Sequence, residues 1–213
     1  MKKVFIVLLS CLLTGTIVAQ ASTNKLRRDL KNKAIKEARR ESRKLAKDGW
    51  QVSPGSLPLP KVLENTWLKQ VMVDENGNVK YINADGNAVA ETKSAAEMQA
   101  IELGKLQLAG LIQTNMASLI TANIGNAQLT TQEAASVTEV IQSAKNIIAM
   151  ELGYVDPSFK LFRYIGKNNV EVQVRLFYDV KQSLEIAKKV VRQELKDKLK
   201  LNEEKLERLM DIR

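Results

Sequence analysis

The hydrophobic positions in the middle of the chain recur with the period of an α-helix. One such stretch runs from Ser94 to about Ala122, with Thr92 or Ser94 as a candidate N-cap and Glu97 three residues beyond Ser94. Its apolar residues cover a broad arc, which predicts burial against a sheet and a neighbouring element. They are Met98, Ile101, Leu103, Leu106, Leu108, Ala109, Leu111, Ile112, Met116, Leu119 and Ile120. We predict that this stretch is the core helix.

A second helical stretch begins after Thr130 or Thr131 and extends to about Leu152. Its apolar positions again recur at steps of three and four. Gly153, followed by Pro157, is typical of the end of a helix. The pattern predicts one continuous helix.

A last helical stretch starts near Val180 and carries apolar residues on one side as far as Leu199. Asn202 is a candidate N-cap for a short terminal helix. The leucines here fit either docking on the same chain or a short coiled coil with another chain, and the sequence favours neither.

Four stretches favour antiparallel strands. Residues 71–73 and 79–81 flank Asp74 to Asn78, whose Asn-Gly pair favours a hairpin turn, so a β-hairpin is predicted there. Phe159 to Ile165 and Val170 to Tyr178 are predicted strands joined by a short turn. In the last of these, valine and leucine alternate with polar residues, which indicates one packed face and one largely wet face.

Together these patterns predict an α+β fold, in which an antiparallel sheet of about four strands has helices packed on one face and is preceded by a basic N-terminal helix. The core domain is assigned to residues 67–200 and a C-terminal helical tail to residues 201–213.

Residues 1–21 have the pattern of a signal peptide. Lys2 and Lys3 precede an apolar run of 15 residues, 4–18, and residues 19–21 form an Ala-x-Ala cleavage site. A membrane anchor needs roughly 20 apolar residues. Lipidation at Cys11 is the other alternative, and it would expose apolar residues 12–18 to water. Cleavage after Ala21 predicts an exported protein, periplasmic or associated with the outer membrane.

The arm, residues 22–48, holds all of the net charge of the mature chain. It has 11 basic and 4 acidic residues, whereas residues 49–213 have 20 of each. A narrow stripe of mostly small residues runs along an otherwise charged helix. The predicted electrostatic binding residues are Lys25, Arg27, Arg28, Lys31, Lys33, Lys36, Arg39, Arg40, Arg43, Lys44 and Lys47. Either these cations bind an anionic surface, or the arm is a solvated helix whose stripe docks on the domain.

Residues 49–66 are predicted as a semi-extended connector, because three of the four prolines lie between Ser53 and Pro60. Trp50 and Trp67 bracket this segment. They are predicted to hold the connector on the core, with an aromatic platform for sugar or peptide as the alternative.

The composition excludes several kinds of chemistry. The chain contains no histidine, which removes histidine-dependent triads and histidine-ligated zinc. Its single cysteine, Cys11, lies in the predicted leader, so the mature chain would have no disulfide.

The remaining candidate motifs are weak. Asp74, Asn76 and Asn78 imitate the start of a calcium loop, but the required glycine and glutamate positions hold Val79 and Asp85. Two acidic pairs, Glu97 with Glu102 and Glu203 with Glu204, lack the spacing of catalytic carboxylates. Ser143 and Lys145 lack the spacing of a Ser-Lys nucleophile motif. Gly104 and Gly110 inside the core helix indicate close approach of another backbone. We predict no enzyme activity, no metal site and no cofactor.

Three stretches resemble a known family. The strand 86–90 followed by the Ala-rich helix 95–112 resembles the twenty-kilodalton outer-membrane lipoprotein family and the related N-terminal domain of a flagellar-assembly protein, and residues 169–176 sit where that family has its final core strands. This likeness covers about residues 81–180. The arm, segments 49–52 and 54–59, and the core together resemble uncharacterised exported proteins of Gram-negative gut bacteria. The resemblance implies a non-enzymatic envelope protein, although the chain departs from the lipoprotein pattern around its cysteine.

The sequence thus favours an exported, non-catalytic cell-envelope protein with an interaction or structural role, in which the basic arm gives electrostatic attachment. The expected partners are an envelope protein and an anionic lipid surface. Nucleic acid is disfavoured because no aromatic residues lie among the cations for base stacking. The alternative is a periplasmic binding module that takes a small ligand or glycan between the sheet and the helices.

Overall fold

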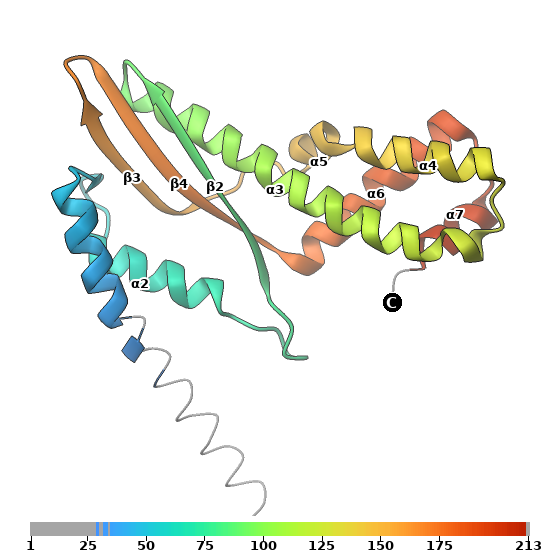
Figure 1. The fold of residues 1–213 in the computed structure, drawn as a ribbon, viewed down its shortest axis with the longest axis horizontal. Helices are drawn as coiled ribbons and strands as arrows, with labels where there is room; N and C mark the ends of the chain where they lie inside the picture. The colour runs from blue at the N-terminus through green and yellow to red at the C-terminus, as the bar shows by residue number, and fades with distance from the viewer. Residues whose placement is uncertain (1–28, 30–31, 34, 212–213) are drawn as a thin grey trace, which may run out of the picture.

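The fold is described here from a computed structural model, which describes residue 29, residues 32–33 and residues 35–211 (Figure 1). The predicted signal peptide lies outside the described residues. So do four of the predicted binding residues, Lys25, Arg27, Arg28 and Lys31.

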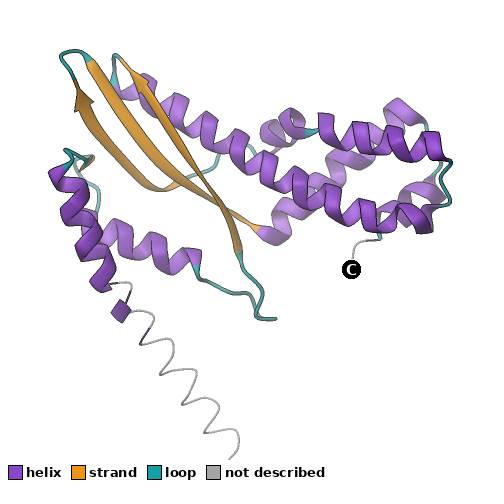
Figure 2. Ribbon diagram, in the orientation of Figure 1, coloured by secondary structure: helices purple, strands orange, loops and turns teal. Residues whose placement is uncertain are grey.

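The described chain forms one antiparallel sheet combined with helices, which confirms the α+β prediction (Figure 2). The four strands are β1 (Gln51–Val52), β2 (Tyr81–Ala90), β3 (Pro157–Ile165) and β4 (Asn169–Asp179), in the order β1-β3-β4-β2. Strands β3 and β4 match the predicted pair closely. Strand β2 pairs with β4 along its whole length, from Tyr81 opposite Asp179 to Ala90 opposite Val170.

Helix α3 (Lys93–Asn123) packs on the first face of the sheet and extends far beyond it (Figure 1). Thr92 is its N-cap, and the Thr92 side chain accepts a hydrogen bond from the backbone N–H of Ala95. A Cβ on Gly86 would overlap the carbonyl oxygen of Ala100, and a Cβ on Gly104 would lie 2.9 Å from Leu176 Cδ1 and 3.5 Å from the nitrogen of Gly86. The backbone of β2 thus approaches α3 at Gly104, as predicted, but the tightest contact of a Cβ there would be with the Leu176 side chain.

The helices that follow α3 in the chain form a bundle with its distal part (Figure 2). They are η1 (Ile124–Ala127), α4 (Thr131–Ser143), α5 (Lys145–Glu151), α6 (Val180–Leu199) and α7 (Glu203–Met210). The prediction of one continuous helix up to Leu152 was wrong, because the chain breaks at Ala144, where α4 ends and α5 begins. The buried side chains of α4 and α5 follow one helical period across this break, so the sequence pattern did not show it.

The C-terminal segment is part of the main core. Asn202 caps α7 as predicted, by accepting a hydrogen bond from the backbone N–H of Lys205 at 2.9 Å. Leu201, Leu206 and Leu209 belong to the same buried cluster as the residues of α3 and α6. The leucines of this segment therefore dock on their own chain, which was one of the two interpretations left open.

Helix α2 (Leu59–Gln70) corrects the predicted extent of the connector. Residues 59–66 are helical rather than extended, and Trp67 lies in the same helix. The prediction failed because Pro60 stands in the first turn, where a missing backbone N–H costs nothing and the fixed φ suits a helix.

The predicted hairpin around residues 74–78 is only partly right. The turn forms, with Gly77 at a φ of 82° and the backbone N–H of Asp74 donating to the carbonyl of Asn78 at 2.8 Å. The pairing, however, is a single bridge between Val73 and Val79. The long strand after the turn pairs with β4 instead, because that pairing buries its alanines and Gly86 against α3.

Candidate functional site

The described part of the arm is a helix over residues 35–47 (Figure 1, blue). Its buried residues lie at steps of three and four: Ala38 is 1% exposed, Ser42 is 6% exposed, and Leu45 is half-buried. These residues share one face of a helix that advances 100° per residue. The interpretation in which the stripe docks on the domain is therefore confirmed for this part of the arm.

The arm docks on the second face of the sheet, the face opposite α3. Leu45 packs against the buried cluster of Trp50, Phe159 and Leu161, to which α2 also contributes Leu59 and Val62. Figure 1 shows the arm helix and α2 together on this side. The second face is thus partly covered near β3.

Polar contacts secure the end of the arm. The backbone N–H of Trp50 donates to the carbonyl of Leu45 at 2.9 Å, and Arg163 Nη1 donates to the carbonyl of Asp48 at 3.3 Å. The Arg163 guanidinium also lies 4.7 Å from the centre of the Trp50 ring, within cation–π distance. Trp50 therefore holds the start of the connector on the core, as predicted, and the same contacts secure the adjoining end of the arm.

Docking leaves the basic side of the arm helix exposed. Six cations of the helix are exposed: Lys36, Arg39, Arg40, Arg43, Lys44 and Lys47. At 100° per residue they occupy an arc opposite Ala38. Glu37 and Glu41 flank the buried stripe, and Glu37 lies 3.9 Å from Arg40. The predicted Lys33 is also exposed. The structure therefore brings these seven predicted binding residues together on the arm.

Sequence reasoning missed the residues that receive the arm. Phe159, Leu161 and Arg163 alternate along β3 on the second face, whereas Phe162 belongs to the core on the first face. Apolar residues at both even and odd positions of a strand indicate that both of its faces are covered. The apolar residues in 159–162 were therefore the sequence signal from which a covered second face could have been predicted.

The middle of the second face is polar and internally paired. Arg175 binds both carboxylate oxygens of Asp85 at 2.5 and 2.7 Å, and the Asp85 hydrogen bonds raise the pKa of Arg175. Glu171, 8% exposed, accepts hydrogen bonds from Asn87 at 2.8 Å and Arg163 at 2.6 Å. Burial opposes ionisation of Glu171, but these hydrogen bonds outweigh it and hold the pKa of the carboxyl below its usual range. Paired in this way, these groups are structural rather than poised for proton transfer.

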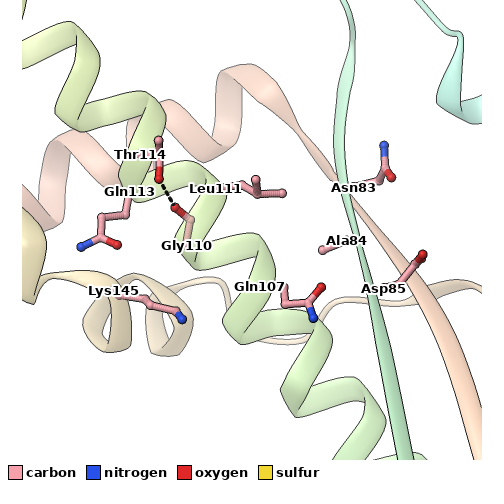
Figure 3. A pocket seen from close by; sticks show the side chains of 9 residues that line it. All are labelled: Asn83, Ala84, Asp85, Gln107, Gly110, Leu111, Gln113, Thr114 and Lys145. Carbon is pink, nitrogen blue, oxygen red and sulfur yellow. Dashed lines mark hydrogen bonds between the residues drawn. The ribbon is translucent and has the colours of Figure 1, made fainter.

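An open hollow of about 560 Å³ lies between β2, α3 and α5 (Figure 3). Asn83, Ala84 and Asp85 of β2 form one side, and Lys145 of α5 lies on the other side of α3. The floor is α3, with Gln107, Gly110, Leu111, Gln113 and Thr114. A Cβ on Gly110 would lie 3.4 Å from Lys145 Cε, so the predicted close approach at this glycine involves a lysine side chain rather than a backbone.

The weak motifs have ordinary structural partners. Glu97 pairs with Lys160, Glu102 with Lys105, Glu203 with Arg192 and Lys196, and Glu204 with Arg208. Ser143 donates its hydroxyl to the carbonyl of Val140 at 2.9 Å. One Asp74 carboxylate oxygen accepts the backbone N–H groups of Asn78 and Asn76, and these bonds, with the first the stronger, lower the pKa of the carboxyl. Asp74 thus acts as a turn residue.

Within the described residues, no group of three or more acidic or cysteine side chains is arranged to hold a metal ion. The helices of the described chain include none with the length and hydrophobicity needed to cross a bilayer. Comparison of the chain with family models, with curated proteins and with solved structures finds no match.

Proposed function

We propose that this chain is an exported, non-catalytic cell-envelope protein that attaches to an anionic lipid surface through its arm. The single observation that carries the proposal is the division of the arm helix into a docked stripe and an exposed cationic face. The pattern of residues 1–21 supports export, and the resemblance of residues 81–180 to an outer-membrane lipoprotein family supports the envelope.

Docking makes the arm a better electrostatic surface than a free helix would be. Ala38 and Ser42 face the domain, so the helix cannot rotate its cations away from a flat surface without undocking. The rest of the chain, residues 49–213, has balanced charge and adds little net repulsion or attraction. Each basic residue near an anionic bilayer contributes about 1 kcal/mol, so six exposed cations can hold the protein at a membrane without any insertion.

A lipid surface fits the arm better than nucleic acid does. Residues 35–47 contain no aromatic side chain on which a base could stack. Large apolar residues are also few in the arm helix, and Leu45 is engaged with the core. We therefore expect attachment that is electrostatic and reversible, and that weakens as salt is added.

Liposome flotation tests the proposal. The full chain is mixed with vesicles of phosphatidylcholine alone or with added phosphatidylglycerol, at low and high salt. A variant with Arg39, Arg40, Arg43 and Lys44 changed to glutamine is compared with a charge-matched control, in which the exposed Lys181, Lys189, Lys196 and Lys198 of α6 are changed to glutamine.

We expect the wild type and the control to float with anionic vesicles at low salt. The arm variant should bind at least roughly a hundredfold more weakly, since it loses about 4 kcal/mol of attraction. Equal binding by the arm variant and the wild type, or equal weakening by the control, would contradict the proposal.

Export is tested separately by mass spectrometry of the N-terminus of the native protein together with cell fractionation. Cleavage after Ala21 and recovery from the envelope are expected. Recovery from the cytosol with Met1 still present would contradict the assignment to the envelope.

A further inference from the structure

The outer edge of β2 offers unpaired backbone groups. Strand β2 ends the sheet, since in the described chain it is hydrogen-bonded only to β4. The backbone N–H of Val180 donates to the carbonyl of Lys80 at 2.9 Å, in register with the β2–β4 pairs. Since bonded positions alternate in an antiparallel pair, the even residues of β2 bond to β4 and the odd residues direct their N–H and C=O groups outward. Asn83, Asp85 and Asn87 are therefore open to a further strand.

Strand β2 lacks the features that usually protect a sheet edge. Residues 81–90 contain no proline and no lysine, and the described register with β4 runs without a bulge. Its single charge, Asp85, is neutralised by Arg175. Natural edge strands without such protection are sites where another chain adds a strand.

The hollow between β2 and α3 provides room for such a strand. Its side wall is formed by Asn83, Ala84 and Asp85, and Figure 3 shows the Leu111 side chain directed toward Ala84 across the gap. Leu111 is 45% exposed, and Leu103, two turns earlier on α3, is 46% exposed. An added strand would set alternate side chains on this apolar flank of α3.

Lys145 contributes a positive charge to the hollow. It takes part in no ion pair with the described residues, whereas all six cations of α6 do. It lines the hollow on the side of α3 away from β2, and its Nζ would lie 3.8 Å from a Cβ on Gly110 (Figure 3). Because Gly110 carries no side chain, an acidic group of a segment in the hollow could meet Lys145 across this part of α3.

We propose that β2 and α3 bind an extended segment of a partner protein, which adds as a further strand to the outer edge of β2. The segment has alternating apolar residues that face Leu103 and Leu111, and an acidic residue or terminal carboxylate that faces Lys145. This inference is independent of lipid attachment, because the arm docks on the opposite face of the sheet.

A random peptide library displayed on phage is selected against the full chain. The peptides that are enriched should share alternating apolar positions and an acidic residue. One enriched peptide is then synthesised, and its affinity is measured by fluorescence polarisation for the wild type and for four variants: N83P, N83A, K145E and K167E.

Proline at position 83 removes an outward N–H and leaves the bonds to β4 intact, whereas N83A keeps that N–H. K145E reverses the charge in the hollow, and K167E makes the same change in the exposed β3–β4 turn. We expect N83P and K145E to bind at least tenfold more weakly, and N83A and K167E to bind like the wild type. K145E keeps the test decisive if N83P folds poorly, because Lys145 is exposed.

Hydrogen exchange identifies the binding mode. Added peptide should slow exchange of the amides of Asn83, Asp85 and Asn87, while the amides of Ala84 and Gly86, already bonded to β4, change little. The proposal is overturned if no peptide is enriched, if the enriched peptide binds N83P and K145E as tightly as the wild type, or if protection appears away from β2.

Discussion

Replacing Gly86 by alanine would place a methyl group against the backbone of helix α3. The new Cβ would overlap the Ala100 carbonyl oxygen and would lie 2.8 Å from the Gly104 nitrogen. Both obstacles are backbone atoms of a helix, so no side-chain rotation relieves the clash. Relief requires α3 to lift from the sheet, which would loosen the buried contacts of Ala96, Ala100 and Leu108 with the strands.

The expected loss of stability lies at the upper end of the usual overpacking cost, about 3 kcal/mol. For a chain of this size that corresponds to a melting temperature lower by about 6–12 °C. Gly104→Ala is the matched comparison. Its Cβ meets a side-chain methyl of Leu176 at 2.9 Å rather than backbone, and alanine gains about 1 kcal/mol of helix propensity over glycine. We expect G104A to stay within about 1 kcal/mol of the wild type.

Urea denaturation followed by circular dichroism measures both variants, at two protein concentrations so that any self-association becomes visible. A G86A variant as stable as the wild type would refute the close contact between β2 and α3. So would a G104A variant that is less stable than G86A.

Three further changes test other parts of the fold. Leu206→Ala should cost about 3 kcal/mol in urea denaturation, because Leu206 is fully buried; a cost near zero would mean that α7 is not part of the core. Thr130→Ala should cost about 1 kcal/mol, because it removes the capping box in which Thr130 and Glu133 exchange hydrogen bonds at 3.2 and 2.8 Å; no change in stability would argue against the cap. The folded pKa of Glu171 is lowered, so its contribution is present above the unfolded pKa of about 4.3 and is lost as the pH falls through the folded value. The stability difference between wild type and Glu171→Gln should therefore shrink from about pH 6 to about pH 3, and a constant difference would contradict the assignment.

Local signals in the sequence predicted most of the elements correctly. The core helix, the strands β3 and β4, the cap at Thr130 and the restart at Asn202 each depend on residues within a few positions of one another. Capping hydrogen bonds and periodic burial involve residues that are close in sequence, so they can be predicted from a single sequence. The cationic side of the arm is visible for the same reason, because helical spacing alone places those residues on one face.

The errors arose where a distant segment decided the outcome. The prolines in residues 53–60 predicted a semi-extended connector. Helix α2 nevertheless begins at Leu59, because its apolar side can pack beside Trp50 and Phe159. The hairpin around Gly77 is short because residues 81–90 pair with β4, which lies about 90 positions later in the chain. Neither residues 53–60 nor residues 81–90 contain a local pattern that predicts the distant segment against which they pack.

The sequence by itself determined the kinds of elements, the charge of the arm and the absence of histidine chemistry, because these follow from residue identity and spacing. Only the tertiary structure decided which face of the arm is left exposed, which edge of the sheet remains open, and that Lys145 lines the hollow next to that edge without an ion pair in the described chain. Those properties depend on which surfaces lose contact with water when distant segments meet, and that is settled by packing of the whole core rather than by any local preference.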